Sequence, residues 1–466
     1  MNMRLPVLLT ASVLFLSGCN LLRTDKSHYA GTDEMLAKGD YSSAIARIDA
    51  ARNEAYKPKD RVLFYLDMGM LLHWNGDYEE SNEYLEMAER AIDENFTKSV
   101  SRAAASLLLN DNVLDYPGED YEDIYLNLFK ALNYLALNQE DDAFVEIRRI
   151  DNKVKLLDDK YGKMALELSD AEEAKVPFRP GKSYFQDSAL GRYLGILLYR
   201  KDAQWDDVRI DLERIDQAWK LQPDIHPFPQ PDFTAEQKRI TKDQARLDLI
   251  AFYGQSPEKT ASTFYVHTEN DLIVLATTAE DYLGKQRLDD LGVIAWPDIR
   301  EGYHFKFQLP SMQKIRSRVH RVEVVISDGP TAALQAIESM ENAAEETFSI
   351  KKPLIYLKTL TRAVAKGLAT ERAKEKMVQD VDDGALSFLI RIFTDMATDQ
   401  TENADLRVSR FFPAEAAVRE IHLDEGVYDL RINYYDINNS LIYSDERSDV
   451  RVDPDRLNVL ESAYLN

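Results

Sequence analysis

Few residues of this chain have the types and spacing that known catalytic or metal sites need. Its seven histidines include no His-x-x-His or His-x-x-x-His pair, so no zinc site on a helix is predicted. The sequence contains neither the glycine-rich loops that cradle phosphate nor a Gly-x-Ser-x-Gly motif, so nucleotide binding has no support. A single cysteine allows neither an internal disulfide nor a cysteine metal cluster.

Two kinds of short pattern could still supply a nucleophile or an acid and a base. The segments Ser256–Lys259 and Ser311–Lys314 match the Ser-x-x-Lys pattern of penicillin-recognising enzymes, but neither has a convincing companion motif. Adjacent carboxylates such as Glu119 and Asp120 could act as acid and base, yet adjacency means little among 81 acidic residues. We therefore expect no cofactor and no metal, and we favour binding over catalysis.

Cys19 carries the clearest chemistry in the chain. Arg4 precedes an apolar run, Leu8 to Leu16, that is too short to span a bilayer, as in a secretory signal peptide. The motif Leu16-Ser17-Gly18-Cys19 resembles the bacterial lipobox, in which the cysteine thiol receives diacylglycerol and the chain is cleaved before it. The resemblance implies a lipoprotein signal peptide at residues 1–18 and a lipid-anchored tether at 19–28. The alternative is an ordinary cleaved signal with an incidental cysteine.

The residue after the cysteine bears on which membrane holds the anchor. By resemblance to bacterial lipoproteins, Asn20 is not the aspartate that commonly retains such proteins at the inner membrane. We therefore expect the protein at the outer membrane, attached through its N-terminal lipid and facing the periplasm.

The overall charge limits the partners of the chain. Its 57 basic and 81 acidic residues give a net charge of −24, so the surface repels nucleic acid and no nucleic acid partner is expected. Because 45% of the 466 residues are apolar, the chain can form folded cores, and two domains are expected.

One segment is basic, in contrast to the acidic character of the chain as a whole. Residues 351–376 contain eight basic residues, whereas Glu371 and Glu375 are their only acids. Lys358, Arg362 and Lys366 recur every four residues and so share one helical face. This row could bind an anionic ligand or partner. Alternatively, acidic residues of the same chain neutralise it.

A sequence repeat predicts how the first half folds. Gly39-Asp40-Tyr41 returns after 37 residues as Gly76-Asp77-Tyr78, between segments with helical apolar periodicity. The second copy resembles the tetratricopeptide repeat in the residue sizes of both helices, and weaker copies follow as far as Pro223. We expect glycine in the tight turns and small residues where helices approach. The packing residues of the first two copies are Gly39, Tyr41, Ala44, Gly69, Gly76, Tyr78, Ser81 and Ala88.

The resemblance implies a solenoid whose concave face binds partner segments. Tyr65, Leu72 and Tyr134 lie on first helices and are the candidate partner-binding residues. An irregular helical array without true repeats is the alternative. The order of signal, repeats and a long C-terminal part is also similar to a group of uncharacterised bacterial repeat-containing envelope lipoproteins.

Prolines between residues 223 and 231 mark the end of the repeats, and a capping helix is predicted at 234–253. The helical repeat domain would thus span residues 29–255. An α+β domain with a mainly antiparallel sheet would span 256–466. Its strands are predicted at 271–278, 303–309, 321–327, 416–423 and 427–435, and its helices at 331–346, 353–376 and 385–397.

These features together predict a lipid-anchored scaffold or adaptor in a bacterial cell-envelope assembly, with envelope proteins as partners. Two alternatives stay open: an envelope enzyme acting on peptidoglycan or glycans, and a carrier or sensor of an anionic ligand in the C-terminal domain.

Overall fold

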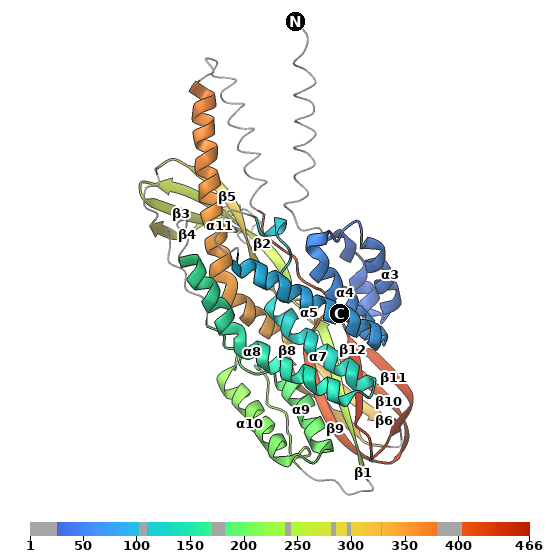
Figure 1. Cartoon of the computed structure of the whole chain (residues 1–466). Helices are drawn as coiled ribbons and strands as arrows, with labels where there is room; N and C mark the ends of the chain where they lie inside the picture. The colour runs from blue at the N-terminus through green and yellow to red at the C-terminus, as the bar shows by residue number, and fades with distance from the viewer. Residues whose placement is uncertain are drawn as a thin grey trace.

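The computed structural model describes residues 26–101, 110–169, 182–237, 244–280, 286–295, 300–327, 329–379 and 403–466. Within them, helices fill the first half of the chain and mainly antiparallel sheets fill much of the second (Figure 1). The predicted order of an all-α part followed by an α+β part is therefore confirmed. Cys19 lies outside the described residues. No helix among the described residues is both long and apolar enough to cross a bilayer.

The helical part consists of antiparallel hairpins. The pairs are α2 (Thr32–Ala37) with α3 (Tyr41–Ala51), α4 (Arg61–Asn75) with α5 (Tyr78–Ser101), α7 (Asp120–Ala136) with α8 (Glu140–Ser169), and α9 (Ala189–Lys201) with α10 (Trp205–Leu221). Three short 3-10 helices lie among them: η2 (Ser27–Tyr29), η3 (Pro58–Asp60) and η4 (Asp111–Val113). Neighbouring hairpins pack together, so the array is continuous (Figure 1).

The four hairpins share one turn geometry. A left-handed residue follows each first helix: Gly39 (φ 68°), Gly76 (φ 87°), Asn138 (φ 59°) and Ala203 (φ 57°). In each turn the next amide donates to a carbonyl five residues earlier, as Asp77 N does to Leu72 O at 2.9 Å. Glycine adopts this conformation without a steric penalty, which explains its place in the first two turns.

The small residues of the α4–α5 hairpin lie where the helices approach. A Cβ added to Gly69 would meet Leu85 Cδ2 at 2.6 Å. The Ser81 hydroxyl donates to the Gly69 carbonyl at 2.7 Å. Ala44 and Ala88 are fully buried, whereas Tyr41 and Tyr78 are half-buried.

Among the described residues, three four-stranded sheets follow the helices. The central sheet has the order β12 (Asn458–Tyr464), β1 (Gln244–Gln255), β9 (Pro413–Asp424) and β8 (Gln335–Ser339). The outer sheet has the order β11 (Leu441–Val452), β10 (Gly426–Tyr435), β6 (Arg321–Ile326) and β7 (Thr331–Ala333). The distal sheet has the order β4 (Gln286–Ala295), β3 (Leu272–Glu280), β2 (Glu258–Glu269) and β5 (His304–Gln313). Only β1 and β12 pair in parallel among the described strands.

The central sheet lies between the helices and the outer sheet. Leu247 and Leu249 of β1 belong to the core shared with the outer sheet, whereas Ile250 and Phe252 belong to the core shared with the helices. Both faces of β1 are therefore buried, and its apolar residues alternate between the two cores. The predicted capping helix at 234–253 is wrong for this reason: residues 244–255 form a strand that pairs with β9 and β12. The boundary at 255/256 falls at the end of this strand.

The predicted helix at 331–346 is also wrong over its first half. Residues 331–333 pair with β6 and residues 335–339 pair with β9, because these pairings satisfy their backbone groups in the two sheets. Helix α11 (Met340–Gln379) begins after them and contains Pro353 in its interior. The predicted helix at 385–397 lies outside the described residues.

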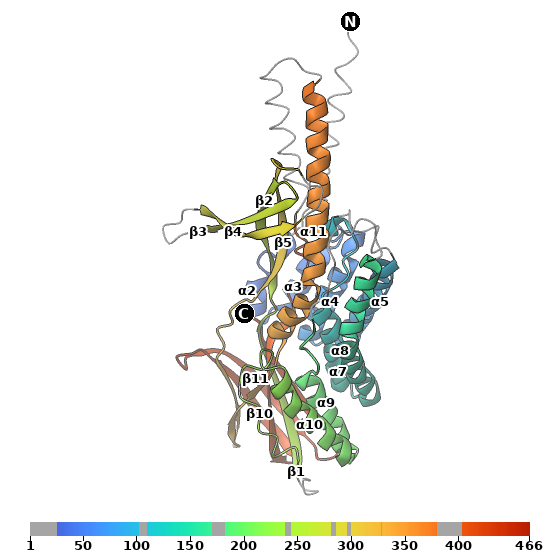
Figure 2. The same cartoon turned by 90° about the vertical axis from the view of Figure 1, so that its left-hand side faces the viewer.

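Helix α11 covers one face of the distal sheet. Ala363 and Leu360 of α11 pack against Val266, Ile273 and Phe307 of the sheet. The distal sheet and the second half of α11 project from the rest of the protein at one end (Figures 1 and 2). A strand of the distal sheet, β2, continues almost directly from β1, which connects this end to the central sheet.

Candidate functional site

The inner side of the helical array is occupied by the chain itself. Residues 403–412, which we call the connecting segment, lead into β9 and lie against the first helices. Asn112 Nδ2 donates to the Ala404 carbonyl at 2.9 Å, and Trp74 Nε1 donates to the Phe411 carbonyl at 2.9 Å. Side chains of the helical part therefore bind the backbone of the connecting segment as they would bind a peptide.

The predicted partner-binding residues fit this arrangement poorly. Leu72 is only 4% exposed and belongs to the core, so it is not available to a partner, and its assignment as partner-binding is wrong. Tyr65 is half-buried, with its ring centroid 6.4 Å from that of Tyr84. Tyr134 is half-buried as well. Apolar first-helix residues also contact the C-terminal part, as Phe129 does with its ring centroid 5.4 Å from that of Phe252.

Two buried carboxylates hold the middle of the connecting segment. The Ser409 hydroxyl donates to Asp67 Oδ1 at 2.7 Å, and the Ser409 amide donates to Glu122 Oε1 at 2.6 Å. Burial raises the pKa of Asp67 to about 6, although the hydroxyls of Tyr29, Ser409 and Tyr56 oppose the rise. Burial and the neighbouring Glu119 raise the pKa of Glu122 to about 7. Each carboxylate accepts hydrogen bonds that fix its position, so both act as structural anchors.

A pocket of about 270 Å³ lies beside the connecting segment, where the helical part meets the C-terminal part. We call it the junction pocket. Its walls come from α5, the segment before α7, α8, β2, β5, α11 and the connecting segment. Its apolar surface is contributed by Phe96, Leu114, Pro117, Pro310, Leu354 and Ile355.

Charged side chains line the rest of the junction pocket. Glu119 contacts both Lys259 and Lys351, and all three side chains are at most 11% exposed. Lys160 lies 2.6 Å from Asp120. Burial alone would raise the pKa of Asp120, but the charges of Lys160 and Lys351 outweigh burial and lower it. The lysines therefore hold Asp120 ionised, which does not suit a general acid.

The basic row of α11 reaches this pocket at one position. Lys358 lines the junction pocket, and burial lowers its pKa, with Asp111 opposing and Arg362 adding to the decrease. Arg362 is 2% exposed and donates to Thr359 Oγ1 at 3.3 Å, so it is an interior residue and not part of an exposed row. The side chain of Lys366 lies outside the described residues.

The two Ser-x-x-Lys segments do not form nucleophile sites. The Ser256 hydroxyl donates to the Ser409 carbonyl at 3.1 Å, while Lys259 pairs with Glu119. Burial would lower the pKa of Lys259, but Glu119 outweighs burial and raises it, which is opposite to the requirement for a general base. Lys314 lies 3.0 Å from Glu345.

The pocket is thus a charged and apolar cavity suited to binding, and its residues do not assemble known catalytic geometry. No family model, curated protein or solved structure matches this chain. The described residues contain no group of three or more side chains placed to hold a metal ion.

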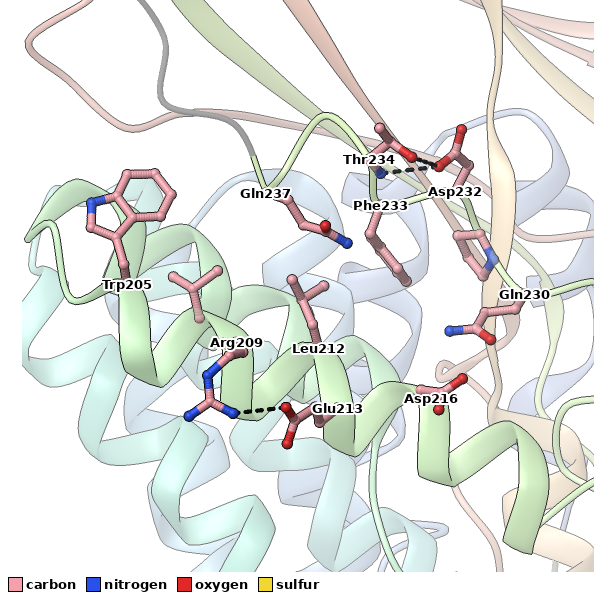
Figure 3. A pocket seen from close by; sticks show the side chains of 12 residues that line it. Trp205, Arg209, Leu212, Glu213, Asp216, Gln230, Asp232, Phe233, Thr234 and Gln237 are labelled. Carbon is pink, nitrogen blue, oxygen red and sulfur yellow. Dashed lines mark hydrogen bonds and ion pairs between the residues drawn. The ribbon is translucent and has the colours of Figure 1, made fainter.

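A second cavity is an open groove of about 700 Å³ along α10. In Figure 3, Leu212 of α10 and Phe233, two residues after Pro231, point toward each other across the groove. Trp205 lies at one end, and Arg209 is paired with Glu213 at 2.7 Å on the helix surface. The prolines between residues 223 and 231 predict only the end of the repeats, so the sequence gives no sign of this groove.

Sequence reasoning also missed most of the junction pocket. It singled out Lys358, but Lys351 and Arg407 reach the same pocket from other parts of the chain. The basic bias of residues 351–376 signalled this region, and the sequence also singled out Glu119, Asp120 and Lys259, although as catalytic candidates. Asp405 lies far away in sequence and carries no local pattern.

Proposed function

We propose that this chain is a lipid-anchored protein of a bacterial cell envelope that binds a small anionic amphiphile in the junction pocket, as a carrier or sensor. The observation that carries the proposal is the position of Lys358, which lines this pocket beside Leu354 and Ile355. A cation next to apolar side chains matches a ligand with an anionic head and a short apolar body. Lipid attachment at Cys19 is part of the same proposal.

The charge of the pocket supports an anion over a cation. Six basic side chains line it against five acidic ones, in a protein whose net charge is −24. The basic lining residues are Lys98, Lys160, Lys259, Lys351, Lys358 and Arg407, and the acidic ones are Asp111, Asp115, Glu119, Asp120 and Asp405. An anion bound near Lys358 would also offset the repulsion between Lys358 and Arg362, whereas a cation would increase it.

The size of the pocket limits the ligand. Its volume is about 270 Å³, slightly below the range of about 300–1,000 Å³ that holds drug-sized molecules. A headgroup with a short chain fits such a volume, whereas a folded peptide does not.

The proposal can be tested by calorimetric titration of the full chain carrying Cys19→Ala, which removes only the anchor. The probes are hexyl phosphate, hexyltrimethylammonium and inorganic phosphate. Hexyl phosphate is expected to bind most tightly, and Lys358→Gln is expected to weaken it about 10-fold or more, because a hydrogen bond to a charged group contributes about 1.5–3 kcal/mol. The matched control is Lys352→Gln, since Lys352 is exposed on the same helix. Equal binding of both amphiphiles, or no effect of Lys358→Gln, would refute the anionic site.

Lipidation has its own test. Wild-type protein is expected to incorporate radiolabelled palmitate and to sediment with the outer membrane, whereas Cys19→Ala should do neither. Label in the Cys19→Ala variant would remove this part of the proposal.

A second candidate function is the scaffold or adaptor, and the groove along α10 favours it. We propose the tetratricopeptide-like character of the hairpins as part of this candidate, supported by the four equivalent turns. Because the inner side of the array is occupied, an envelope protein would bind at Leu212 and Phe233. In-cell crosslinking should then lose specific partners in Leu212→Asp and retain them in Ile210→Asp, since Ile210 is 45% exposed on α10 but does not line the groove. Identical crosslinks in both variants would exclude the groove.

A further inference from the structure

The point where the described chain begins is fixed next to the junction pocket. Lys26 Nζ donates to the Lys259 carbonyl at 2.8 Å and lies 3.5 Å from Glu258 Oε2. The side chain of the same Lys259 lines the junction pocket. The N-terminal tether therefore leaves the protein at the start of β2, close to this pocket.

The tether is short compared with the protein. Cys19 precedes Lys26 by seven residues, and seven residues span at most about 25 Å when fully extended. If Cys19 carries lipid, as the proposed function states, the bilayer surface lies within this distance of Lys26. The start of β2, which Lys26 contacts, is then held close to the membrane by the tether.

The distal sheet has one face without a covering element among the described residues. Val266, Ile273 and Phe307 point toward α11, so the alternate residues point away from it. Strand pairing places Tyr265, Leu272 and Val293 on this other face. His267, Glu269 and Lys306 lie on the same face. Their exposed fractions are 38%, 39% and 59%. An aromatic hydroxyl side chain beside exposed aliphatic ones is typical of surfaces that contact the membrane interface.

The charge of α11 favours the same partner. Beyond the buried Arg362, residues 363–379 of this helix include four basic residues and two acidic ones, in contrast to the acidic chain as a whole. This half of α11 projects from the protein together with the distal sheet (Figures 1 and 2). Basic residues near an anionic lipid surface contribute roughly 1 kcal/mol each.

We propose that the end formed by the distal sheet and residues 363–379 of α11 faces the bilayer, and that its partner is the surface of an anionic phospholipid membrane. This inference rests on the lipid anchor of the proposed function. It places the junction pocket beside the membrane, where an anionic amphiphile would be supplied by the bilayer. The opposite end, at the turn between β9 and β10, faces away from the membrane.

Energy transfer from two matched positions tests this orientation. Val293→Cys and Val427→Cys are each labelled with a donor fluorophore in the lipidated full chain, in which the introduced cysteine is the only free thiol. Val293 and Val427 are both exposed valines in strands, at 59% and 61%. Val427 lies beside the β9–β10 turn, next to the start of β1, and Val293 lies in the distal sheet. The acceptor is a headgroup-labelled lipid in vesicles containing phosphatidylglycerol.

Transfer is expected to be at least twofold more efficient from Val293 than from Val427. The difference should decrease in phosphatidylcholine vesicles and at high salt, because salt screens the attraction of α11 to anionic lipid. Equal transfer from both positions, or more efficient transfer from Val427, would overturn the orientation. If the difference in transfer efficiency does not change with lipid charge or salt, then an anionic membrane surface is not the partner.

The same vesicles separate failure of this inference from failure of the anchor. On phosphatidylcholine vesicles at high salt, where the attraction of α11 to anionic lipid is removed, Cys19→Ala should not float with the vesicles. If it floats there like the wild type, then the lipid anchor is disproved. If the wild-type protein floats but both labels report equal transfer, then the lipid anchor is retained as a proposal and the orientation is disproved.

Discussion

Arg407 and Asp60 form a buried ion pair between residues 347 positions apart, with 2.9 Å between Arg407 Nη1 and Asp60 Oδ1. The guanidinium also lies 2.8 Å from Asp405 Oδ2, and it is centred 5.2 Å from the Tyr116 ring. Burial would raise the pKa of Asp405, but Arg407 outweighs burial and lowers it. This arginine therefore attaches the connecting segment to the helical part.

Removing that arginine should destabilise the fold. Arg407→Ala is expected to lower the free energy of unfolding by about 3–5 kcal/mol, because it leaves buried carboxylates without their countercharge. The control is Arg209→Ala, whose pair with Glu213 is exposed and should contribute about 0.5 kcal/mol or less. Urea denaturation at pH 7 compares the two, and similar midpoints would contradict the anchoring role.

The interior carboxyl of Glu415 should make stability depend on pH. Burial raises its pKa to about 8, while Ser339 opposes the rise. Because the folded pKa exceeds the model-peptide value, the folded state holds this proton more tightly, and stability falls as pH rises from about 4.5 to about 8. Glu415→Gln has no carboxyl to titrate at this position, so this decrease in stability with pH should be absent from the variant.

Urea denaturation of wild type and Glu415→Gln at pH 5, 7 and 9 measures this effect. The variant should gain stability relative to wild type as pH rises, by an amount on the order of 1 kcal/mol or more at pH 9. A difference that is constant across the three pH values would show that Glu415 does not titrate in this window.

The helix contact at Gly69 should tolerate no larger side chain. Gly69→Ala is expected to lower stability by about 1–3 kcal/mol, because the added Cβ meets Leu85 and overpacks the core. Gly162 of α8 has open space around its Cβ position, so Gly162→Ala should raise stability by up to about 1 kcal/mol through helix propensity. Thermal unfolding of both variants should show shifts of opposite sign. Shifts of the same sign would contradict this packing.

Leu72 should behave as a core residue. Leu72→Ala is expected to cost about 2–5 kcal/mol of stability through the cavity it leaves. Leu221 is the matched control, since it is 54% exposed near the end of α10, and Leu221→Ala should change stability by about 0.5 kcal/mol or less. If Leu72→Ala kept full stability and lost a binding partner, the original assignment of Leu72 as partner-binding would be restored.

The hairpins could be predicted because their signals are local. A left-handed turn favours glycine at one position, and a close helix contact needs small residues at another, so Gly76, Gly69 and Ser81 show the α4–α5 hairpin directly. The alternating strands β6 and β10 were found for the same reason, since each buries one face against the central sheet.

Strand β1 could not be recognised in this way. Its two faces lie in different cores, so Leu247, Leu249, Ile250 and Phe252 are all apolar and read equally well as a helix. Pairing with β9 and β12 makes this segment a strand instead of a helix, and these two strands lie about 170 and 210 residues later. A local pattern carries no information about such distant partners.

The sequence by itself determined the order of helical and mixed parts, the hairpin turns and the basic character of α11, because each depends on residues close together in the chain. Only the tertiary structure decided which surfaces remain free. It buried Leu72 and Arg362, filled the inner side of the array with the connecting segment, and joined Lys358 to Glu119 and Arg407 around one pocket. These outcomes depend on contacts between segments hundreds of residues apart, and burial is a property of the assembled cores.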